Sequence, residues 1–366
     1  MNLIKWQHNP LRDLAPSESL AVFDRVQADQ VRRYHQSWPR YRPTPLRSLH
    51  GLAARWGLEE VLVKDESQRW GLRAFKGLGG THGVGRYLAE YYGLSPGADF
   101  SALTAHYPLR PPVVFATATD GNHGVGIAWA ATQLGHTSKI YMPRGSARAR
   151  VEAVEAAGGE VEVTALDYDA TVEWAAAEAG RHGWVFMQDT FRDGSREIPQ
   201  WIMQGYMTMM TEEFLDEKEV PPSKPTLVIV QAGVGSFAAA IVAFLANLYG
   251  SDIPRVIVVE PTEAACLYRS ASVGDRALYP SPGSLSTIMA GLACGVANPV
   301  AWEILQHWVT VFAACEDRVT ARGMRILGNP LRGDPRIVAG ESGAVGLGLL
   351  SLIASVSDEA WPAKAA

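Results

Sequence analysis

Lys76 stands in the stretch LRAFKGLGG (72–80), where an aromatic residue precedes it and glycines follow almost at once. A lysine amine attacks carbonyl groups when it is desolvated and its proton affinity is lowered. Phe75 supplies an apolar wall, and the glycines would let a flat ligand approach the backbone closely. The alternative is a solvated or salt-bridged lysine, which is the usual fate of this residue. The stretch is therefore a candidate site for chemistry on a carbonyl compound.

Glycine-rich stretches recur along the chain, at 77–85, 120–126, 232–236 and 340–348. Each alone is typical of a tight turn. We interpret them as loops at strand–helix junctions, because junctions at the carboxyl ends of parallel strands are where such sheets bind ligands. The AGVGS loop at 232–236 opens onto an alanine-rich helical stretch, so its backbone N–H groups would suit a phosphate. The sequence lacks the full GxGxxG dinucleotide fingerprint and its downstream acid.

A lysine, a phosphate loop and an asparagine on a second glycine loop together describe a site for pyridoxal phosphate. Lys76 is the lysine, 232–236 is the phosphate loop and Asn122 is the asparagine. No member of this set is specific by itself. The combination carries the interpretation.

Short apolar runs that alternate with Ala- and Leu-rich stretches must position these residues. The predicted strands are 113–118, 139–143, 161–166, 185–190, 227–231 and 255–261. The predicted helices are 124–135, 146–159, 169–183 and 199–217. Strand followed by amphipathic helix, repeated, indicates parallel sheets with crossover helices. We therefore expect an α/β fold, doubly wound, with proline-bearing linkers at 218–225 and 279–284.

Length and composition restrict the class of protein. A chain of 366 residues predicts two domains, and 47% apolar with 19% charged residues is typical of a globular protein. A net charge of −5 and the lack of a long run of like charge argue against nucleic-acid binding. Three cysteines without a CxxC pair make a poor disulfide framework, and the N-terminus shows no signal peptide, so a cytoplasmic location is expected.

The uncharged segment 227–250 is long enough to cross a bilayer. It divides, however, into a β-branched run, a glycine loop and an Ala-rich helical stretch. We therefore expect a buried strand–loop–helix unit and no membrane span.

Five motifs in one order resemble the diaminopropionate ammonia-lyase family. They are LRAFKGLGGT (72–81), ATDGNHG (118–124), QAGVGS (231–236), TIMAGLACG (287–295) and GESGAVGLG (340–348) with the RI-GNP of 325–330. That family belongs to the fold-type II pyridoxal phosphate enzymes, which are tryptophan synthase β-like and include the serine/threonine dehydratases. The resemblance runs from about residue 30 to residue 350. It implies two lobes with mostly parallel sheets flanked by helices and the cofactor between them.

The resemblance also implies domains, cofactor contacts and partners. Residues 1–88 and 205–366 would form the larger, cofactor-binding domain, and 89–204 the smaller α/β domain. Lys76 would form the internal Schiff base with pyridoxal 5′-phosphate, and Asn122 would contact its 3-hydroxyl. The residues that would line the phosphate site are Gly233, Val234, Gly235, Ser236 and Phe237. The residues that would help to hold the substrate carboxylate are Thr119, Asp120, Gly121, Asn122 and His123. Relatives convert both enantiomers of 2,3-diaminopropionate to pyruvate and two ammonia molecules, and a homodimer is expected.

Two acidic residues fit that chemistry. Freed Lys76 is placed to act as base for the L-isomer, and Asp120, where many dehydratases carry a small residue, is the candidate base for the D-isomer. Asp189 is the candidate for holding the β-amino group as an ammonium near the site. The alternatives are a helix N-cap or Asx-turn for Asp120 and a strand-end cap for Asp189. Within these motifs we favour catalysis.

Other residues in the motifs have less defined roles. His123 is expected to stabilise its loop or to lie on the carboxylate side; a metal role is not expected, because no second ligand lies at metal spacing. Cys266 and Cys294 match positions where the family carries cysteines, so either a buried thiol or a bond between them is an open alternative. Glu341 and Ser342 would approach the ring without an assigned role.

The family continues after GESGAVGLG to a further strand with a Ser/Thr-Glu-Gly motif, whose hydroxyl lies near the pyridine nitrogen. Here the chain continues as LLSLIASVSDEAWPAKAA (349–366), in which 357–366 reads as a polar tail. The residue that faces the ring nitrogen is therefore not identified. Two alternatives to a diaminopropionate lyase stay open: a serine/threonine dehydratase-like lyase, and a pyridoxal phosphate-binding homologue with weak or no activity.

Overall fold

The structure, a computed structural model, describes residues 3–190, 196–215 and 223–355. The contacts divide these residues into two compact units. Unit 1 comprises the described residues within 1–24, 44–67 and 216–366, and unit 2 those within 25–43 and 68–215. The domain boundaries expected from the sequence stay a prediction. The contacts group 68–88, which carries Lys76, with the segment that follows it.

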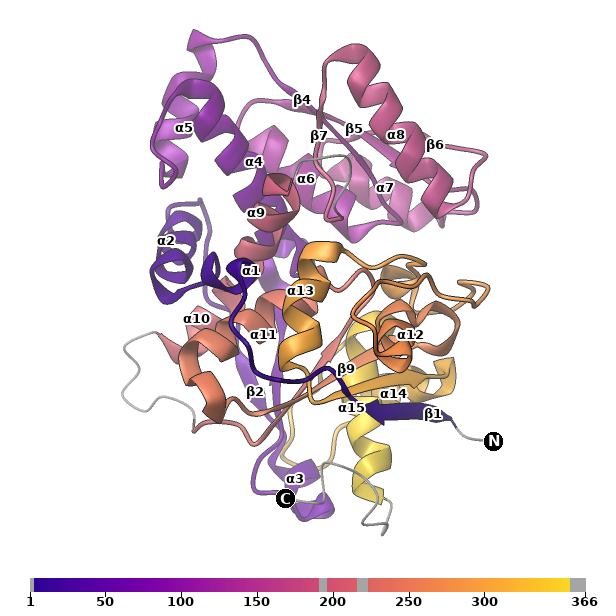
Figure 1. Cartoon of the computed structure of the whole chain (residues 1–366). Coiled ribbons are helices and arrows are strands. Elements are labelled where there is room, and N and C mark those ends of the chain that lie inside the picture. Colours follow the sequence, from indigo (N-terminus) through magenta and orange to yellow (C-terminus); the bar gives the residue numbers. More distant parts are fainter. Residues whose placement is uncertain (1–2, 191–195, 216–222, 356–366) are drawn as a thin grey trace. The chain divides into compact units, whose positions relative to one another are not determined.

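Unit 2 contains a four-stranded parallel sheet with the order β6-β5-β4-β7. Its strands are β4 (Val114–Ala118), β5 (Thr137–Met142), β6 (Glu160–Val163) and β7 (Val185–Phe186). The helices that follow them are α6 (Asn122–Gln133), α7 (Arg148–Ala156), α8 (Tyr168–His182), α9 (Glu197–Tyr206) and α10 (Thr208–Phe214). The predicted alternation is confirmed, but the predicted strand 185–190 is shortened to Val185–Phe186, and the expected helix 199–217 is two helices within the described residues. Figure 1 shows α8 on one side of this sheet and α6 with α7 on the other.

The remaining helices of unit 2 are α2 (Arg25–Gln36), α4 (Lys76–Tyr92) and α5 (Phe100–His106). Helix α4 packs against both α6 and α9. Because α6 begins at the end of β4, this packing brings the start of α4 to the strand–helix junctions of the sheet.

Unit 1 contains a second four-stranded sheet with the order β1-β10-β9-β8. Its strands are β1 (Ile4–His8), β8 (Leu227–Gln231), β9 (Arg255–Pro261) and β10 (Val311–Cys315), and a separate antiparallel pair consists of β2 (Leu46–Ser48) and β3 (Leu62–Lys64). Strands β8, β9 and β10 are parallel, whereas β1 is antiparallel to β10, with Ile4 opposite Cys315. Strand β9 coincides with the predicted run 255–261. The helices of unit 1 are α1 (Glu18–Ala21), α3 (His50–Trp56), α11 (Ser236–Tyr249), α12 (Cys266–Val273), α13 (Pro299–Trp308), α14 (Asp317–Gly328) and α15 (Glu341–Ser355).

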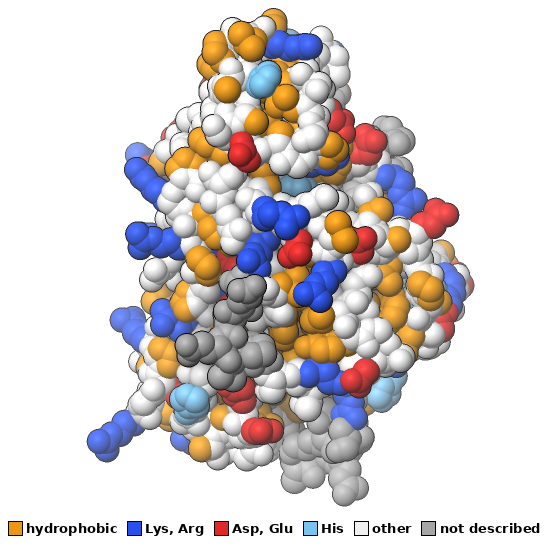
Figure 2. Space-filling model, turned by 90° about the vertical axis from the view of Figure 1, so that its left-hand side faces the viewer, with side chains coloured by type: hydrophobic (Ala, Val, Ile, Leu, Met, Phe, Trp, Pro, Cys, Tyr) orange, Lys and Arg blue, Asp and Glu red, His pale blue; other side chains and the backbone are white. Residues whose placement is uncertain are grey.

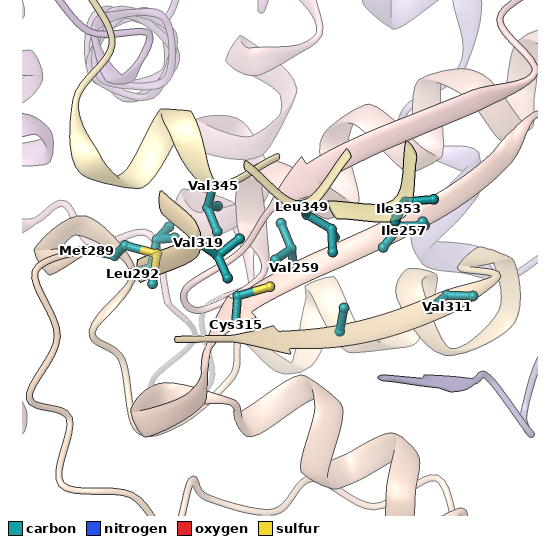
Figure 3. Packing of buried hydrophobic residues seen from close by; sticks show 11 residues of the cluster. Ile257, Val259, Met289, Leu292, Val311, Cys315, Val319, Val345, Leu349 and Ile353 are labelled. Atoms are coloured by element: carbon teal, nitrogen blue, oxygen red, sulfur yellow. The ribbon is translucent and has the colours of Figure 1, made fainter. Parts of the chain in front are cut away.

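Alternate residues of β9 and β10 build the core of unit 1. One face carries Ile257, Val259, Val311 and Cys315, which pack against side chains of α14 and α15 (Figure 3). The other side chains of this cluster are Met289, Leu292, Ala313, Val319, Val345, Leu349 and Ile353. Burying a side chain of the size of valine or leucine contributes roughly 1.5–3 kcal/mol, so this face is a main source of stability for the sheet.

The glycine-rich stretch 77–85 is helical, which corrects the expectation of a loop. A Cβ added at Gly79 would lie 2.6 Å from the ring of Tyr206 in α9, and one added at Gly80 would lie 2.6 Å from the backbone of Gly126 in α6. Residues larger than glycine would therefore push these helices apart. The space that we assigned to a flat ligand is filled at these two positions by neighbouring helices. Likewise, Gly348 lies inside α15 and allows close contact with Val319 of α14.

The segment 227–250 forms strand β8, a glycine loop and helix α11, as the sequence predicts. In the described part of the chain, no helix is long and apolar enough to span a membrane. Figure 2 shows basic, acidic and hydrophobic side chains interspersed over one face. That mixture follows from a chain with 33 Lys and Arg and 38 Asp and Glu residues.

The predicted linker at 279–284 has unit 1 residues on both sides, so it does not join the two units. It is held by the Tyr279 N–H, which donates to Ser270 Oγ at 2.9 Å, and by the Ser281 N–H, which donates to the Gly295 carbonyl at 2.8 Å. The other predicted linker, 218–225, lies mostly outside the described residues. The tail 357–366 lies wholly outside them.

Candidate active site

Lys76 is the first residue of α4, and a strained segment leads into it. Trp70, Gly71 and Arg73 have φ values of +47°, +78° and +57°, in the left-handed region. Two of these three residues carry a side chain there, at an energetic cost that the surrounding packing must offset. The side chain of Lys76 is 22% exposed, so its amine is partly desolvated and still accessible.

The amine of Lys76 lies 2.6 Å from Oδ2 of Asp189. Asp189 follows β7 by three residues, and only 5% of its side chain is exposed. Burial alone would raise the pKa of Asp189, but the charge of Lys76, with smaller effects of His123 and of the hydrogen bond from Lys76, lowers it to about 2. Asp189 is therefore an ionised carboxylate that holds an ammonium group. The strand-end cap considered from the sequence is not its main contact.

The loop 119–123 is organised by its own residues. The Oγ1 of Thr119 accepts hydrogen bonds from the N–H groups of Gly121 at 2.9 Å and Gly124 at 3.2 Å. Gly121 has φ +156° and ψ −86°, a combination that side-chain-bearing residues rarely adopt. Asn122 opens α6 and is exposed, so its amide is available to a ligand.

His123 is buried behind this loop. Its Nε2 lies 2.9 Å from the carbonyl oxygen of Met187, so Nε2 carries the proton and donates. Burial lowers the pKa of His123, although Asp189 acts in the opposite direction. The ring is therefore neutral, and its buried Nδ1 has no hydrogen-bond partner within the described residues. His123 links the loop to the segment before Asp189, which fits the loop-stabilising alternative. Its Nδ1 is an acceptor, so it cannot donate a hydrogen bond to a substrate carboxylate.

Asp120 does not cap α6. The N-cap of that helix is Gly121, which makes no side-chain cap bond. Instead, Oδ2 of Asp120 lies 3.6 Å from Nη1 of Arg150 in α7. Burial raises the pKa of Asp120 above its usual value, Arg150 and then Lys76 oppose the rise, and Asp189 adds to it. Asp120 is thus a carboxyl group that binds a proton more readily than usual, which suits a base.

The predicted phosphate loop lies in unit 1, between β8 and α11. Gly235 has φ +95° and is the N-cap of the 14-residue α11, without a side-chain cap bond. A Cβ added at Gly233 would lie 3.1 Å from Cα of Leu292. Asn298 secures this loop, because its Nδ2 donates to Ser236 Oγ at 2.9 Å and its N–H donates to the carbonyl of Val234 at 2.8 Å. A bare helix N-terminus of this kind favours an anion.

The predicted residues thus form two groups. In unit 2 the structure brings Lys76 and Asp189 into contact and places Asp120 near both, with Thr119, Gly121, Asn122 and His123 on the adjoining loop. In unit 1 it places Gly233, Val234, Gly235, Ser236 and Phe237 at one helix N-terminus. In unit 2 a lysine beside a buried carboxylate suits a carbonyl compound, and in unit 1 the glycine-lined helix N-terminus suits a phosphate; a cofactor that carries both groups has a matching partner in each unit.

The cysteines form no disulfide bond within the described residues. Cys266, Cys294 and Cys315 are free thiols, so the bond considered between Cys266 and Cys294 is not present. Ser342, on α15, lies beside Gly291 of unit 1. Within residues 3–190, 196–215 and 223–355, no group of three His, Cys, Asp or Glu is arranged to hold a metal ion.

Two residues of these sites were missed by sequence reasoning. Arg150 lies in the predicted helix 146–159 and received no role of its own. A cation in the first turn of a helix opposes the helix dipole, and this unfavourable position could have indicated a partner outside the helix. Asn298 precedes Pro299 at the start of α13, which is a helix-start signal. The hydrogen bond from Asn298 to Ser236 could not be predicted from the sequence.

The fold and the two groups of residues define an α/β enzyme that uses a carbonyl cofactor with a phosphate. A family model for pyridoxal-phosphate dependent enzymes matches residues 38–360. Diaminopropionate ammonia-lyase of Escherichia coli (strain K12) is 46% identical over 339 residues, which are 92% of this chain and 83% of that protein. The crystal structure of the Escherichia coli diaminopropionate ammonia lyase in complex with D-serine is similar with a TM-score of 0.88 and 45% identity, over 96% of this chain and 87% of that one. Its crystal structure in complex with an aminoacrylate-PLP azomethine reaction intermediate gives a TM-score of 0.86 and 45% identity, over 96% and 86% of the two chains.

The chain therefore belongs to the diaminopropionate ammonia-lyase family of fold-type II, pyridoxal phosphate-dependent enzymes. Pyridoxal phosphate is its cofactor, and the expected fold class is confirmed.

Proposed function

We propose that this protein is an ammonia-lyase that eliminates the β-amino group of 2,3-diaminopropionate, taking both enantiomers. With one water consumed, the products are pyruvate and two ammonia molecules. The single observation that carries this choice of substrate is the buried, ionised carboxylate of Asp189, which already holds an ammonium group at 2.6 Å. An amine leaving group needs such a partner, whereas the hydroxyl of serine does not.

The cofactor contacts proposed are those that the sequence suggested. Lys76 is the lysine that attaches to the cofactor, Asn122 is the partner of its ring hydroxyl, and the loop from Gly233 to Phe237 holds its phosphate. The bare N-terminus of α11 and the fit of Gly233 against Leu292 support the phosphate assignment. When bound, pyridoxal phosphate supplies an electron sink for the pair left by the departing α-proton.

The chain's own groups move the protons. The amine of Lys76, once it is released from the cofactor, takes the α-proton of the L-isomer on one face. The carboxylate of Asp120 takes the α-proton of the D-isomer on the other face, and its raised pKa favours acceptance of that proton. The 119–123 loop holds the substrate carboxylate with backbone N–H groups other than those of Thr119 and Gly121, which donate to Tyr141 and to Thr119 Oγ1. His123 keeps this loop against the strand end through Met187.

Asp189 serves the leaving group. While Lys76 is attached to the cofactor, and after its release as the neutral amine that acts as base, the carboxylate of Asp189 is available to the β-ammonium of the substrate, which occupies the same kind of contact as the lysine amine does in this structure. Keeping the β-amino group protonated lets it depart as ammonia. The burial of Asp189 strengthens this interaction because water does not screen it.

The test compares pyruvate release from D-diaminopropionate, L-diaminopropionate and L-serine by the same preparation of holoenzyme. We expect kcat/KM to be higher for both diaminopropionates than for serine, and Asp120→Asn to lower activity on the D-isomer more than on the L-isomer. A clear preference for serine would identify the protein as a dehydratase. Equal loss on both isomers would refute the assignment of Asp120 to one face.

The homodimer is proposed on the likeness to the diaminopropionate ammonia-lyase family, and the cytoplasmic location is proposed on the cysteine usage of the chain. Sedimentation of the purified holoenzyme and fractionation of the producing cells test them.

A further inference from the structure

Arg150 makes three contacts with the loop that carries Asp120. Its Nη1 lies 3.6 Å from Oδ2 of Asp120 and 3.5 Å from the carbonyl oxygen of the same residue. The aliphatic part of its side chain covers Gly121, where an added Cβ would lie 3.5 Å from Cδ of Arg150. The guanidinium therefore contacts both the carboxylate and the backbone of Asp120, and the stem confines the glycine that follows.

The position of Arg150 within helix α7 is electrostatically unfavourable. The first turn of this helix contains no acidic residue, and a cation at that end opposes the helix dipole. Arg148, in the same turn, is 91% exposed and pairs with Glu152 one turn later. Arg150 instead reaches back to the 120–121 loop, with 36% of its side chain exposed. The 120–121 loop is thus a partner of Arg150 outside its own helix.

Three described charged groups act on the carboxylate of Asp120: Arg150, Lys76 and Asp189. Lys76 already pairs with Asp189. Its amine is also the group that attaches to the cofactor, so the charge of Lys76 changes during the reaction. Asp189 and burial both favour protonation of Asp120. A guanidinium stays protonated at every relevant pH. Among these groups, Arg150 is the fixed cation.

We propose that Arg150 is a positioning residue that keeps Asp120 ionised and oriented as the base, and that it thereby sets the lower pH limit for turnover of the D-isomer. This inference rests on the proposed function of Asp120. It makes Arg150 a determinant of enantiomer preference, because Lys76 is the base for the L-isomer.

The test uses Arg150→Met, which keeps an aliphatic stem over Gly121 but removes the charge, and Arg150→Lys, which restores a charge. Arg148→Met is the matched control, since it removes the same charge from the same turn of α7. We measure kcat/KM against pH for D- and L-diaminopropionate with each holoenzyme. We also titrate the carboxyl carbon of Asp120 by NMR in cofactor-free protein, assigned with Asp120→Asn.

In Arg150→Met, loss of an adjacent cation should shift the titration of Asp120 to higher pH by about one unit. Because the base must be ionised, the acid limb for the D-isomer should move up by a similar amount. At a pH on that limb, kcat/KM for the D-isomer should fall about tenfold, while the L-isomer changes less than about twofold. Arg150→Lys should recover most of the loss, and Arg148→Met should match the native enzyme.

Two results would overturn the inference. An unchanged Asp120 titration and acid limb in Arg150→Met would show that the charge does not act on Asp120. An equal rise of KM for both isomers would show that Arg150 binds the substrate carboxylate. Failure of the proposed function is recognised separately. In that case Asp120→Asn would lower kcat/KM equally for both isomers, while the NMR titration would still report on the interaction of Arg150 with Asp120.

Discussion

A single contact, between Lys76 and Asp189, explains how one carboxylate can serve an enzyme at two stages. When the amine of Lys76 is free and protonated, it neutralises Asp189 at 2.6 Å. With that amine attached to the cofactor, Asp189 needs another cation, because a buried and unpaired carboxylate is costly. The β-ammonium of diaminopropionate is a cation of matching type. On the function proposed above, the site selects for a diamine because the uncompensated charge of Asp189 needs a cation from the substrate.

We predict that Asp189→Asn lowers kcat/KM for diaminopropionate by about 100-fold or more, since an amide cannot hold the β-amino group in its protonated form. Turnover of L-serine should fall by less than about tenfold, because a hydroxyl leaving group makes no use of the charge. Pyruvate formation from each substrate measures both effects. Asp189→Glu is the control that keeps the charge. Equal losses on the two substrates would show that Asp189 acts only on Lys76.

A second carboxyl group, Glu260 at the end of β9, is expected to make the stability depend on pH. It is fully buried, and it accepts hydrogen bonds from the N–H groups of Leu267 at 2.9 Å and Tyr268 at 2.7 Å. Burial raises its pKa to about 8, against 4.5 for an ordinary glutamate. The folded state thus binds the proton more tightly than the unfolded state. The resulting stabilisation is complete below pH 4.5 and is lost as pH rises through about 8.

We predict that the free energy of unfolding falls between about pH 5 and pH 8 by up to about 1.4 kcal/mol per pH unit on account of Glu260. Glu260→Gln cannot titrate, so its stability relative to the native protein should increase over this range. Thermal unfolding midpoints of both proteins at several pH values give the comparison. A constant difference between the two proteins would assign the slope to other groups.

At the scale of elements, the packing of α4 places the active lysine. Gly80 meets the backbone of Gly126 in α6, and Gly205 of α9 meets the backbone of Leu78 and Gly79. Helices can approach this closely only where side chains are missing, so Lys76 is carried at the end of a helix that is fixed on two sides. This packing of α4 on two sides keeps Lys76, its first residue, next to Asp189.

We predict that Gly80→Ala destabilises the protein by about 1–3 kcal/mol and reduces cofactor loading, because α4 and α6 must separate. The matched control is Gly180→Ala in α8, where an added Cβ meets nothing within 4 Å. That change should stabilise by up to about 1 kcal/mol, since alanine is the better helix former. Unfolding midpoints and absorbance of the bound cofactor measure both variants. A stable, fully loaded Gly80→Ala protein would contradict this account of α4.

The sequence predicts most of the elements that alternate as strand and helix, because their apolar periodicity is local. Strand β9 agrees at both ends with the predicted run, and the loop at 232–236 lies at the expected junction. The helix α4 was not predicted, because glycine has a low intrinsic helix propensity and only tertiary packing overrides it. Similarly, Lys76 and Asp189 are recognisable from their motifs. The partnership of Arg150 with Asp120 is not, because it depends on how α7 lies against a loop 30 residues earlier.

At the scale of the whole molecule, unit 2 is assembled from two stretches of chain, and a buried ion pair holds them together. Arg69 binds both oxygens of Glu212, at 2.7 and 2.9 Å, and each side chain is 1% exposed. From the other stretch, Tyr41 donates to Glu212 Oε1 at 2.6 Å, and the carbonyl of Arg42 accepts from Arg69 at 3.3 Å. The pair therefore fixes residues 41–42 against the segment that precedes Lys76.

We predict that Arg69→Met destabilises the protein by about 3–5 kcal/mol, because it leaves the charge of Glu212 buried without its partner. Replacing both residues, as Arg69→Met with Glu212→Leu, should recover most of the loss, since no buried charge then remains. Denaturant unfolding of the native, single and double variants forms the required cycle. Additive losses in the double variant would refute the coupling.

The pairing of β1 with β10 has a consequence for how the protein is made. Ile4 lies opposite Cys315 in the finished sheet, and the whole of unit 2 is encoded between them. At a synthesis rate of about 5–20 residues per second, β1 leaves the ribosome roughly 15–60 seconds before its partner strand exists. All residues of unit 2 are synthesised within that interval, whereas β1 has no partner strand until residues 311–315 follow. Chaperones that bind short apolar segments should therefore find β1 without its partner strand during that interval.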